Sequence, residues 1–429
     1  MRHQSIVHFV APLALLGLTF PAAAQQDLPI LRSNSKTISI IDGDHVKSNY
    51  WFLMPEKDPD IYHVEIPMKP HTVTFRTDID ERSFDVRYGD RIDFVILLNG
   101  QTVCRTQIRA EFRNLTTLTR DESLPPAGDL EIPFTLGDND KIYIRGRLND
   151  GEELTFQFDL GNGGTIVKRG SVPKANLKFD GTITLRNSDG VAQVPSSSSN
   201  HLQIAGLHWR GLRVDVADNM THREDGLIGN TLFQDKIIEI DYDRDVMVVH
   251  DAPPPIDPAA SRHAIVLDGV VPFVHGSLTI SGVRRDGWFM FDTGAYTSIL
   301  YTDRWKPWSK LLLELRGIFG ADTASSGPRL TLGDHAFSGF NYSVHIDPHP
   351  DDHLSILGND ILKRFNVTLD NQNGMIYLRP NSLAGDGFRN PEYVLARVIL
   401  AAAIFVVLAA GWIIRRRRAR SRSAAGSPV

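Results

Sequence analysis

Short runs of alternating apolar and polar residues fill the chain between residues 27 and 115. Turn-forming residues separate the runs, a pattern typical of β-strands that bury one face. The strands that we expect include KTISIID, HTVTFRTDI, RIDFVILLNG and TVCRTQI. The pattern therefore predicts an N-terminal β-sandwich-like domain at residues 27–122, with a boundary in the proline-rich stretch 123–133.

Two segments of similar length follow, at residues 130–250 and 262–382, and an extended proline-rich linker at 251–261 separates them. The segments repeat each other in three blocks, with displacements of 133, 128 and 129 residues. Chance similarity between β-rich sequences explains one such block but not three in the same order, so we infer an internal duplication. The matching blocks are 155–167 with 288–300, 202–216 with 330–344, and 227–249 with 356–378.

An aspartate follows an apolar strand at matching positions of the two segments. Asp292 comes directly after the apolar run Trp288–Phe291, and Asp159 occupies the equivalent position in the first copy. Burial of a lone carboxylate is unfavourable, whereas two carboxyl groups that share a proton form a catalytic unit. Two copies of one fold commonly pack about a pseudo-two-fold axis, so we expect Asp159 and Asp292 to meet on it.

The loop Asp292-Thr293-Gly294-Ala295 resembles the active-site loop of the aspartic proteases of the retropepsin and pepsin-like superfamily. In that family an apolar-apolar-Gly element packs beneath each loop, and Leu227-Ile228-Gly229 and Ile356-Leu357-Gly358 match it. The resemblance covers roughly residues 130–382 and is carried by both copies. It implies an all-β fold with a β-barrel lobe from each copy, and an aspartic endopeptidase that needs neither metal nor cofactor.

The resemblance also assigns roles to residues of both loops. Asp159 and Asp292 are the catalytic pair: one activates a water molecule as general base, and the other, protonated, polarises the scissile carbonyl group. Gly229 and Gly358 pack beneath the loops. The residues that support the catalytic loops are Gly161, Asn162 and Thr165 in the first copy, and Thr293, Gly294, Ala295 and Ser298 in the second.

The first loop reads Asp-Leu-Gly-Asn and departs from the family pattern, in which a Thr or Ser after each Asp bonds across the axis. Leu160 has no hydroxyl group, so the contact is at best one-sided, with Thr165 or Asn162 as an alternative donor. This departure favours a second hypothesis, a catalytically inactive protease-like binding or sensor module. A third is a structural envelope protein whose β domains serve as a scaffold.

Two loop segments carry further candidate chemistry. The candidate flap is the segment 179–200, with a hairpin turn at Asn187–Gly190 and a mobile loop in SSSSN. The stretch HIDPHPDDH at 345–353 holds three His and three Asp residues, which are metal-ligand types. Its two prolines favour a polar surface loop, so we predict no metal site.

Both ends of the chain have the composition of export and membrane signals. Residues 1–24 resemble a signal peptide, with an N-terminal anchor as the alternative. The 21 residues 394–414 are apolar except for Arg397, and the arginine-rich tail 415–429 follows. These features predict a single transmembrane helix with its C-terminus in the cytoplasm and the bulk of the chain in a bacterial periplasm. A buried core helix and a sorting signal are the alternatives.

The charge of the exported part gives no reason to expect nucleic-acid binding. Residues 25–392 hold 38 Lys and Arg against 51 Asp and Glu, a net charge of −13. The single cysteine, Cys104, excludes an internal disulfide. The partners that we expect are therefore a protein or peptide substrate and the inner membrane.

Overall fold

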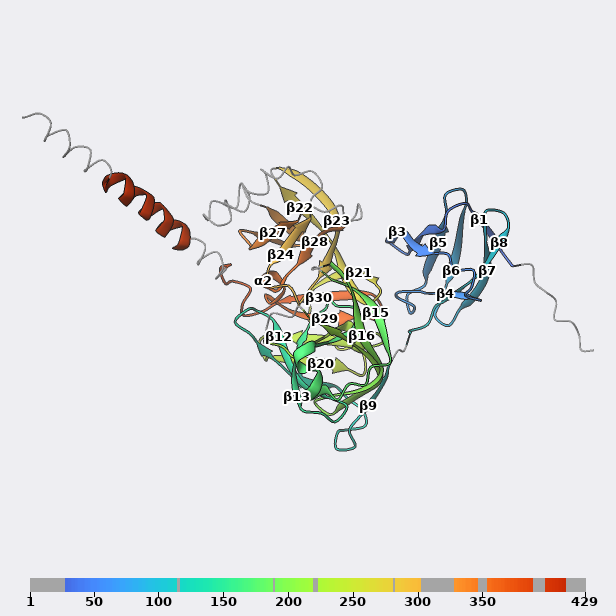
Figure 1. Ribbon diagram of the computed structural model, residues 1–429, viewed down its shortest axis with the longest axis horizontal. Coiled ribbons are helices and arrows are strands. Elements are labelled where there is room, and N and C mark those ends of the chain that lie inside the picture. Colours follow the sequence, from blue (N-terminus) through green and yellow to red (C-terminus); the bar gives the residue numbers. More distant parts are fainter. Residues whose placement is uncertain are drawn as a thin grey trace, which may run out of the picture.

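The computed structural model describes residues 28–113, 116–187, 190–218, 223–280, 282–301, 328–345, 353–388 and 398–413. Most of these residues lie in β-strands, so the predicted all-β class is confirmed. Figure 1 shows an N-terminal group of strands in blue, a larger β body that runs from green to orange, and a helix in red.

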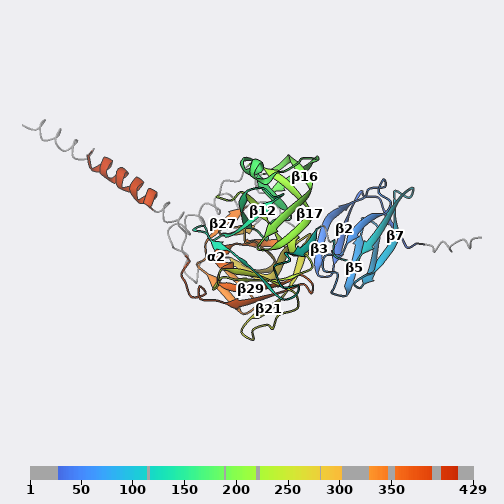
Figure 2. The ribbon, with the colours of Figure 1, turned by 90° about the horizontal axis from the view of Figure 1, so that it is seen from below.

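The N-terminal strands form two four-stranded sheets that enclose one apolar core. In this core Phe75 packs against both Tyr62 and Phe94, with ring centroids 5.6 and 4.8 Å apart. The first sheet has the order β1 (Ile30–Ser33), β7 (Arg91–Leu98), β8 (Thr102–Arg109), β4 (Asp60–His63), and the second β3 (His45–Phe52), β2 (Thr37–Asp42), β5 (His71–Arg76), β6 (Glu81–Val86). The two sheets lie beside the body, as Figure 2 shows.

Strand β9 (Thr117–Arg120) falls in the range predicted for the N-terminal domain but pairs with β17 (Leu207–Ala217) of the body. Leu118 stands opposite Trp209 in this pair and packs against the core of the body. The boundary of the N-terminal domain therefore lies before Thr117 rather than at residue 122. The alternating pattern of this stretch identifies a strand but not the sheet that it joins.

The first copy of the repeat supplies a nine-stranded sheet. Its order is β11 (Thr135–Leu136), β12 (Ile142–Leu148), β13 (Glu153–Phe158), β18 (Gly226–Ile228), β14 (Thr165–Lys168), β17, β16 (Gly190–Ile204) and β15 (Gly181–Asn187), with β9 beside β17. Two short helices, η1 (Arg169–Ala175) and η2 (Asn230–Phe233), belong to this copy. The buried Trp209 donates its indole N–H to the carbonyl of Leu232 at 2.9 Å and so ties the sheet to η2.

A thirteen-stranded sheet joins the second copy to the end of the first. Its order is β10 (Leu130–Pro133), β20 (Val246–His250), β19 (Ile237–Asp241), β29 (Phe365–Asp370), β30 (Met375–Pro380), β21 (Ser261–Asp268), β22 (Val271–Ile280), β23 (Val283–Phe291), β28 (His353–Leu357), β24 (Ser298–Tyr301) and β27 (Tyr342–His345). Strand β25 (Arg329–Leu332) pairs with β22 and with β26 (His335–Ser338), and the helix α2 (Asn359–Leu362) follows β28. A single apolar core runs through both copies.

The sequence repeat is also a repeat of strand connections. The strand before each acidic loop, β13 or β23, pairs antiparallel with β12 or β22 and parallel with β18 or β28. The strand after the loop, β14 or β24, pairs antiparallel with β18 or β28 and parallel with β17 or β27. The two copies therefore present equivalent loops at the ends of equivalent strands.

The two copies meet along the antiparallel pair β19–β29. Ile240 stands opposite Val367 in this pair, and Ile238 stands opposite Leu369. The 129-residue displacement of the repeat converts the first pair into the second, because it takes Ile240 to Leu369 and Ile238 to Val367. The register is thus unchanged when the copies are exchanged, so a pseudo-two-fold axis passes through the middle of the strand pair.

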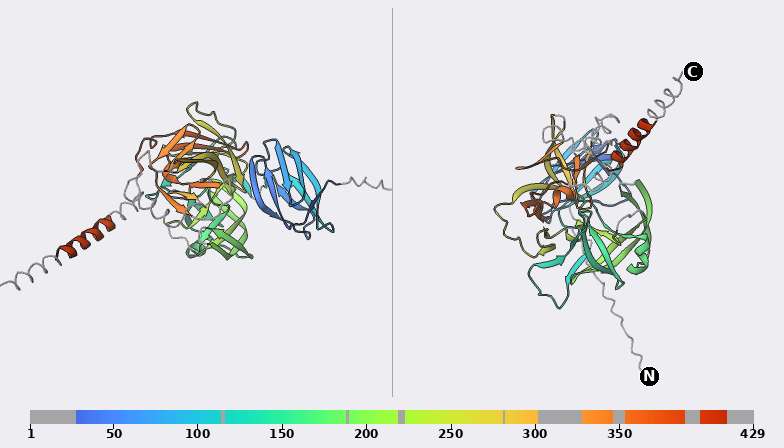
Figure 3. Two further views of the ribbon diagram at one scale, coloured as in Figure 1. Left: turned by 90° about the horizontal axis from the view of Figure 1, so that it is seen from above. Right: turned by 90° about the vertical axis from the view of Figure 1, so that its left-hand side faces the viewer.

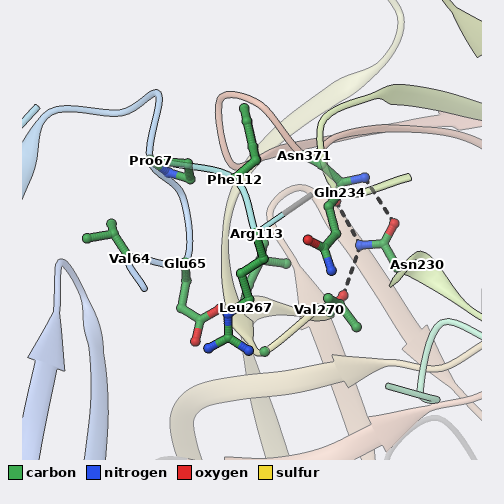
Figure 4. Close-up of a pocket in the computed structure, with 11 residues that line it drawn as sticks. Val64, Glu65, Pro67, Phe112, Arg113, Asn230, Gln234, Leu267, Val270 and Asn371 are labelled. Carbon is green, nitrogen blue, oxygen red and sulfur yellow. Dashed lines mark hydrogen bonds between the residues drawn. The ribbon is translucent and has the colours of Figure 1, made fainter. Parts of the chain in front are cut away.

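The N-terminal domain contacts both copies at a small cavity, shown in Figure 4. On one wall Asn230 and Asn371 each donate an amide N–H to the other, at 2.8 and 2.9 Å, and Asn230 also donates to the carbonyl of Val270. The side chains of Glu65 and Arg113 come from the N-terminal part of the chain. Three parts of the chain therefore meet at this point.

Residues 398–413 form a helix that stands apart from the sheets, as Figure 3 shows. Its large apolar side chains are exposed, including Phe405 and Val407. Across the described residues, no helix is both long and apolar enough to cross a membrane. The predicted signal 1–24, residues 394–397 and 414 of the predicted span, and the tail 415–429 lie outside the described residues.

Candidate functional site

Two acidic loops occupy equivalent places at the ends of β13 and β23. The backbone N–H of Asp159 donates to the carbonyl of Ile228 at 2.9 Å, and that of Asp292 donates to the carbonyl of Leu357 at 3.1 Å. Each aspartate is thus fixed to the apolar-apolar-Gly strand of its own copy, β18 or β28. The parallel strand pairs bring both loops to the pseudo-two-fold axis.

The two carboxyl groups meet between the loops. A Cβ atom added to Gly161 would lie 2.5 Å from Asp292 Cγ, and one added to Gly294 would lie 2.5 Å from Asp159 Oδ1. Each glycine of one copy therefore packs against the aspartate of the other, where no larger residue fits. The two carboxyl groups are within hydrogen-bonding reach of each other and interact as a coupled pair. Both side chains are half-buried.

Burial raises the pKa of both aspartates. The pKa of Asp159 lies well above its usual range, because desolvation and the neighbouring Asp292 both disfavour its ionised form. Desolvation also raises the pKa of Asp292, but the hydrogen bond from Asp159 and the backbone N–H groups of Gly294 and Ala295 oppose it. Of the two carboxyl groups, Asp159 is therefore the one that binds a proton more tightly.

Hydrogen-bond donors are distributed unequally between the two carboxyl groups. Asp292 Oδ1 accepts from the backbone N–H of Gly294 at 2.7 Å and of Ala295 at 3.1 Å. Asp159 Oδ2 accepts a longer bond of 3.4 Å from the side chain of Gln157, and its buried Oδ1 has no donor among the described residues. This difference favours the ionised form at Asp292.

A single hydroxyl group connects the two loops. Thr293 Oγ1 donates to the carbonyl of Phe158 and accepts the backbone N–H of Leu160, both at 3.0 Å. Leu160 is fully buried in the core and returns no side-chain hydrogen bond. Neither expected substitute bridges the loops: Asn162 donates to the carbonyl of Gly164 in its own loop, and Thr165 Oγ1 has no partner among the described residues.

The apolar-apolar-Gly elements pack directly against the two loops, as the sequence motif predicts. A Cβ atom on Gly229 would collide with the carbonyl of Asn162, and one on Gly358 would lie 2.5 Å from the backbone of Thr297. Ser298 Oγ accepts the N–H of Gly358 at 3.2 Å and donates to Asp360 Oδ1 at 3.1 Å. These contacts support the loop in the second copy through a side chain that its counterpart Thr165 does not match.

Asp360 is a buried acid that the sequence motifs do not identify as part of the site. Burial raises its pKa to about 8 despite the hydrogen bond from Ser298. Its second oxygen has no partner in the described part of the chain. Thr231 is the counterpart in the first copy, and its hydroxyl group donates to the carbonyl of Gly163 at 2.9 Å. A protonated Asp360 is consistent with this uncharged counterpart.

Sequence reasoning also missed a polar pair beside Asp159. Lys141 Nζ donates to Gln157 Oε1 at 3.2 Å, and Gln157 in turn donates to Asp159. A polar Gln inside the apolar run TFQF, two residues before the aspartate and therefore on the same face of the strand, is the one available signal. Lys141 gives none, because its proximity depends on the pairing of β12 with β13.

The candidate flap segment forms a hairpin of β15 and β16, paired from Gly181–Ser196 to Asn187–Gly190. Residues 188 and 189 of the expected turn lie outside the described residues. SSSSN is not the loop that we expected but part of β16. Its Asn200 is buried and donates to the carbonyls of Ser197 and Leu212, both at 2.9 Å, which holds a β-bulge in the strand.

The structure describes only the two ends of the candidate metal-ligand stretch 345–353. His345 ends β27 and His353 begins β28, while residues 346–352 between them lie outside the described residues. Within the described ranges no three potential metal ligands cluster. Cys104 is buried in the N-terminal core, and burial raises the pKa of its thiol.

No protein-family model matches the chain, and a search of curated proteins finds no match. Any functional assignment therefore depends on the geometry of the paired loops.

Proposed function

We propose that this protein is an aspartic endopeptidase of the retropepsin and pepsin-like superfamily, with two β-barrel lobes in one chain behind an N-terminal β-sandwich. The observation that carries the proposal is the reciprocal packing of Gly161 on Asp292 and of Gly294 on Asp159. This packing brings two acids together that would each be unfavourable alone. The resemblance in sequence and the equivalent strand connections of the two copies support the same assignment.

In the proposed mechanism the pair works with one shared proton. Asp292, whose carboxylate accepts two backbone N–H groups, acts as the general base toward a water molecule. Asp159 carries the proton and donates it toward the carbonyl oxygen of the substrate. Water adds to the carbonyl carbon as one of its protons passes to Asp292, which gives a tetrahedral diol and an ionised Asp159. The leaving nitrogen then takes the proton from Asp292 as the C–N bond breaks, and a hydroxyl group of the diol returns a proton to Asp159 as the carbonyl group re-forms. The pair returns to its starting protonation without a covalent intermediate.

We further propose that the enzyme is anchored in the inner membrane of a bacterium and faces the periplasm. The support is the apolar stretch 394–414 with its arginine-rich tail, the signal-like residues 1–24, and the exposed apolar side chains of helix 398–413. Substrates would then be proteins near the membrane surface. Deletion of residues 389–429 should release the protein from membranes, as fractionation in high salt and carbonate measures.

The one-sided contact between the loops favours a second candidate, a protease-like module that binds a partner without cleaving it. Leu160 supplies packing where the family pattern has a hydrogen-bonding hydroxyl group. Such a module would keep the folded pair of loops and retain a partner from membrane extracts. It would show no cleavage between about pH 3 and pH 8, the range in which a carboxyl pair titrates.

The deciding experiment measures cleavage of a denatured protein substrate by the full chain in detergent. Asp292→Asn and Asp159→Asn should each reduce cleavage by at least about 1,000-fold, because the pair acts as a unit. A circular-dichroism melt of each variant shows whether the fold is retained. Activity that survives either substitution contradicts the proposal, and complete inactivity of the unsubstituted chain favours the binding module.

A further inference from the structure

We propose that Lys141 is a positioning residue of the carboxyl pair, which holds Asp159 through Gln157 and supplies the counter-charge for the single negative charge that the pair carries. The inference rests on the proposed function for its mechanistic meaning. The contacts of Lys141 do not depend on that function, and a stability measurement tests them without any catalysis.

The strand register places Lys141 beside the pair. Tyr143 stands opposite Gln157 in the β12–β13 pair, and Ile142 stands opposite Phe158. Side chains alternate between the faces of a strand, so Lys141, two residues before Tyr143, shares its face and lies across from Asp159. The side-chain contacts agree with this register, because Lys141 Nζ lies 3.2 Å from Gln157 Oε1 and Gln157 Nε2 lies 3.4 Å from Asp159 Oδ2.

Lys141 is buried, and its ammonium group donates a hydrogen bond to the neutral amide of Gln157. The side chain is 8 % exposed, and transfer of a cation into such a site is unfavourable unless negative charge lies nearby. Three carboxyl groups supply that charge, those of Asp159, Asp292 and the buried Glu224. Burial lowers the pKa of Lys141, and these three acids oppose the decrease.

The second copy shows that the fold does not require this arrangement. In the β22–β23 pair Phe273 stands opposite Met290, the positions that correspond to Tyr143 and Gln157. Two residues before Phe273 is Val271, the counterpart of Lys141. Both polar groups beside Asp159 are thus replaced by apolar ones beside Asp292. The lysine is an addition to one side of a pseudo-symmetric site.

The charge of Lys141 acts on both aspartates and lowers the pKa of each. The other charged groups nearby are Glu224, which also faces Lys141, and Asp140, which forms an ion pair with Lys363 at 2.8 Å. Removal of the lysine charge should therefore raise both pKa values of the pair. The active form has one proton, so both limbs of the pH–rate profile should move to higher pH.

The test compares Lys141→Met with Lys141→Arg in the full chain, with Val271→Met as a matched control in the second copy. We expect Lys141→Met to shift both limbs of the kcat/KM profile upward by at least about half a pH unit. Lys141→Arg, which keeps the charge, and Val271→Met should leave the limbs in place. If the pH–rate profile of Lys141→Met keeps both limbs in place and only kcat falls, the role of Lys141 is structural and the proposal is overturned.

A second readout is independent of peptidase activity. Without the lysine charge, the folded carboxyl pair should bind its protons more tightly than the unfolded chain does. The thermal midpoint of Lys141→Met should therefore fall relative to that of the unsubstituted chain as the pH rises from about 4 to about 7. In an Asp159→Asn, Asp292→Asn background this pH-dependent difference should shrink to the part that Glu224 contributes. If it persists there undiminished, Lys141 does not act on the carboxyl pair and the proposal fails, even for an active peptidase. If only cleavage is absent, the proposed function fails while the electrostatic role of Lys141 is retained.

Discussion

The two acidic loops have the same backbone frame but different side-chain support. The second loop has a hydroxyl bridge from Thr293, two N–H groups on its carboxylate, and the Ser298–Asp360 contact behind it. The first loop has Leu160 in the core, and its aspartate accepts a longer bond from the amide of Gln157. Positioning therefore comes from the backbone and glycines of both copies, whereas hydrogen bonding comes mainly from the second. The second copy supplies most of the hydrogen bonds to the carboxyl pair, and the first copy supplies the positive charge beside it.

The contacts behind the loops keep the symmetry that the loops themselves have lost. Asn230 of the first copy bonds to Asn371 of the second, and Asn359 accepts the hydroxyl group of Tyr242 at 3.2 Å. Tyr242 and Asn371 are counterparts in the repeat, as are Asn230 and Asn359. Each copy thus binds the same part of its neighbour.

Apart from replacement of the aspartates themselves, the largest effect should come from the two glycines that face them. Gly161→Ala and Gly294→Ala each place a methyl group within 2.5 Å of a carboxyl group of the other copy. Separation of the pair should reduce kcat/KM by at least about 100-fold. Gly163→Ala is the matched control, because nothing lies within 4 Å of its added Cβ atom. Equal activity of Gly161→Ala and Gly163→Ala contradicts the placement of the pair.

Asp360→Asn tests the acid that only the second copy contains. Its pKa is about 8 in the folded protein against an ordinary 3.8, so the folded state keeps a proton that the unfolded chain releases. The stability from this group is complete below about pH 4 and is lost as the pH rises toward 8. Between these limits the free energy of unfolding of the unsubstituted chain should fall relative to that of Asp360→Asn, by an amount on the order of 5 kcal/mol.

Denaturant unfolding at several pH values measures this difference. Thr231→Val, the substitution at the corresponding position of the first copy, removes no titrating group and serves as the control. It should leave the pH dependence of the unsubstituted chain unchanged. Parallel stability curves for Asp360→Asn and the unsubstituted chain would show that Asp360 is ionised in the fold.

Thr293→Val should be the most costly change to the bridge between the loops. It removes the hydroxyl group that accepts the N–H of Leu160 and that donates to the carbonyl of Phe158, at a cost of about 2–4 kcal/mol in the free energy of unfolding. Thr165→Val changes a buried hydroxyl group that has no recorded partner and should be neutral or stabilising. If the Thr293 hydrogen bonds contribute nothing to the free energy of unfolding, Thr293→Val and Thr165→Val should be equally stable.

The smallest effect should come from Leu160→Met. Leu160 fills space in the core, and a volume-conserving exchange of this kind usually costs less than about 1.5 kcal/mol. Cleavage should stay within about twofold of the unsubstituted chain, because this side chain gives the carboxyl pair no hydrogen bond. Thermal melts and kcat/KM measure both quantities. A large loss of activity with little loss of stability would assign Leu160 a direct part in the chemistry.

The sequence indicated the meeting of Asp159 with Asp292, because duplication of an acidic loop implies two loops on one axis. It also indicated that the bridge is at best one-sided, since Leu160 has no hydroxyl group, but it left open Thr165 and Asn162 as substitutes, and neither bridges the loops. Lys141 could not be predicted, because its position beside Asp159 is set by strand register rather than by a local motif. The strand character of SSSSN depends on the buried bonds of Asn200, which a polar composition does not reveal.

The strand pair β19–β29 has a consequence for how the chain is assembled. Residues 251–260 of the linker 251–261 lie outside the strands, between β20 and β21, while the two halves are joined by backbone hydrogen bonds across the axis. A break in this linker removes covalent continuity but none of the contacts that make the site. Two fragments, one ending and the other beginning in this linker, should therefore associate when produced in the same cell and re-form the paired loops.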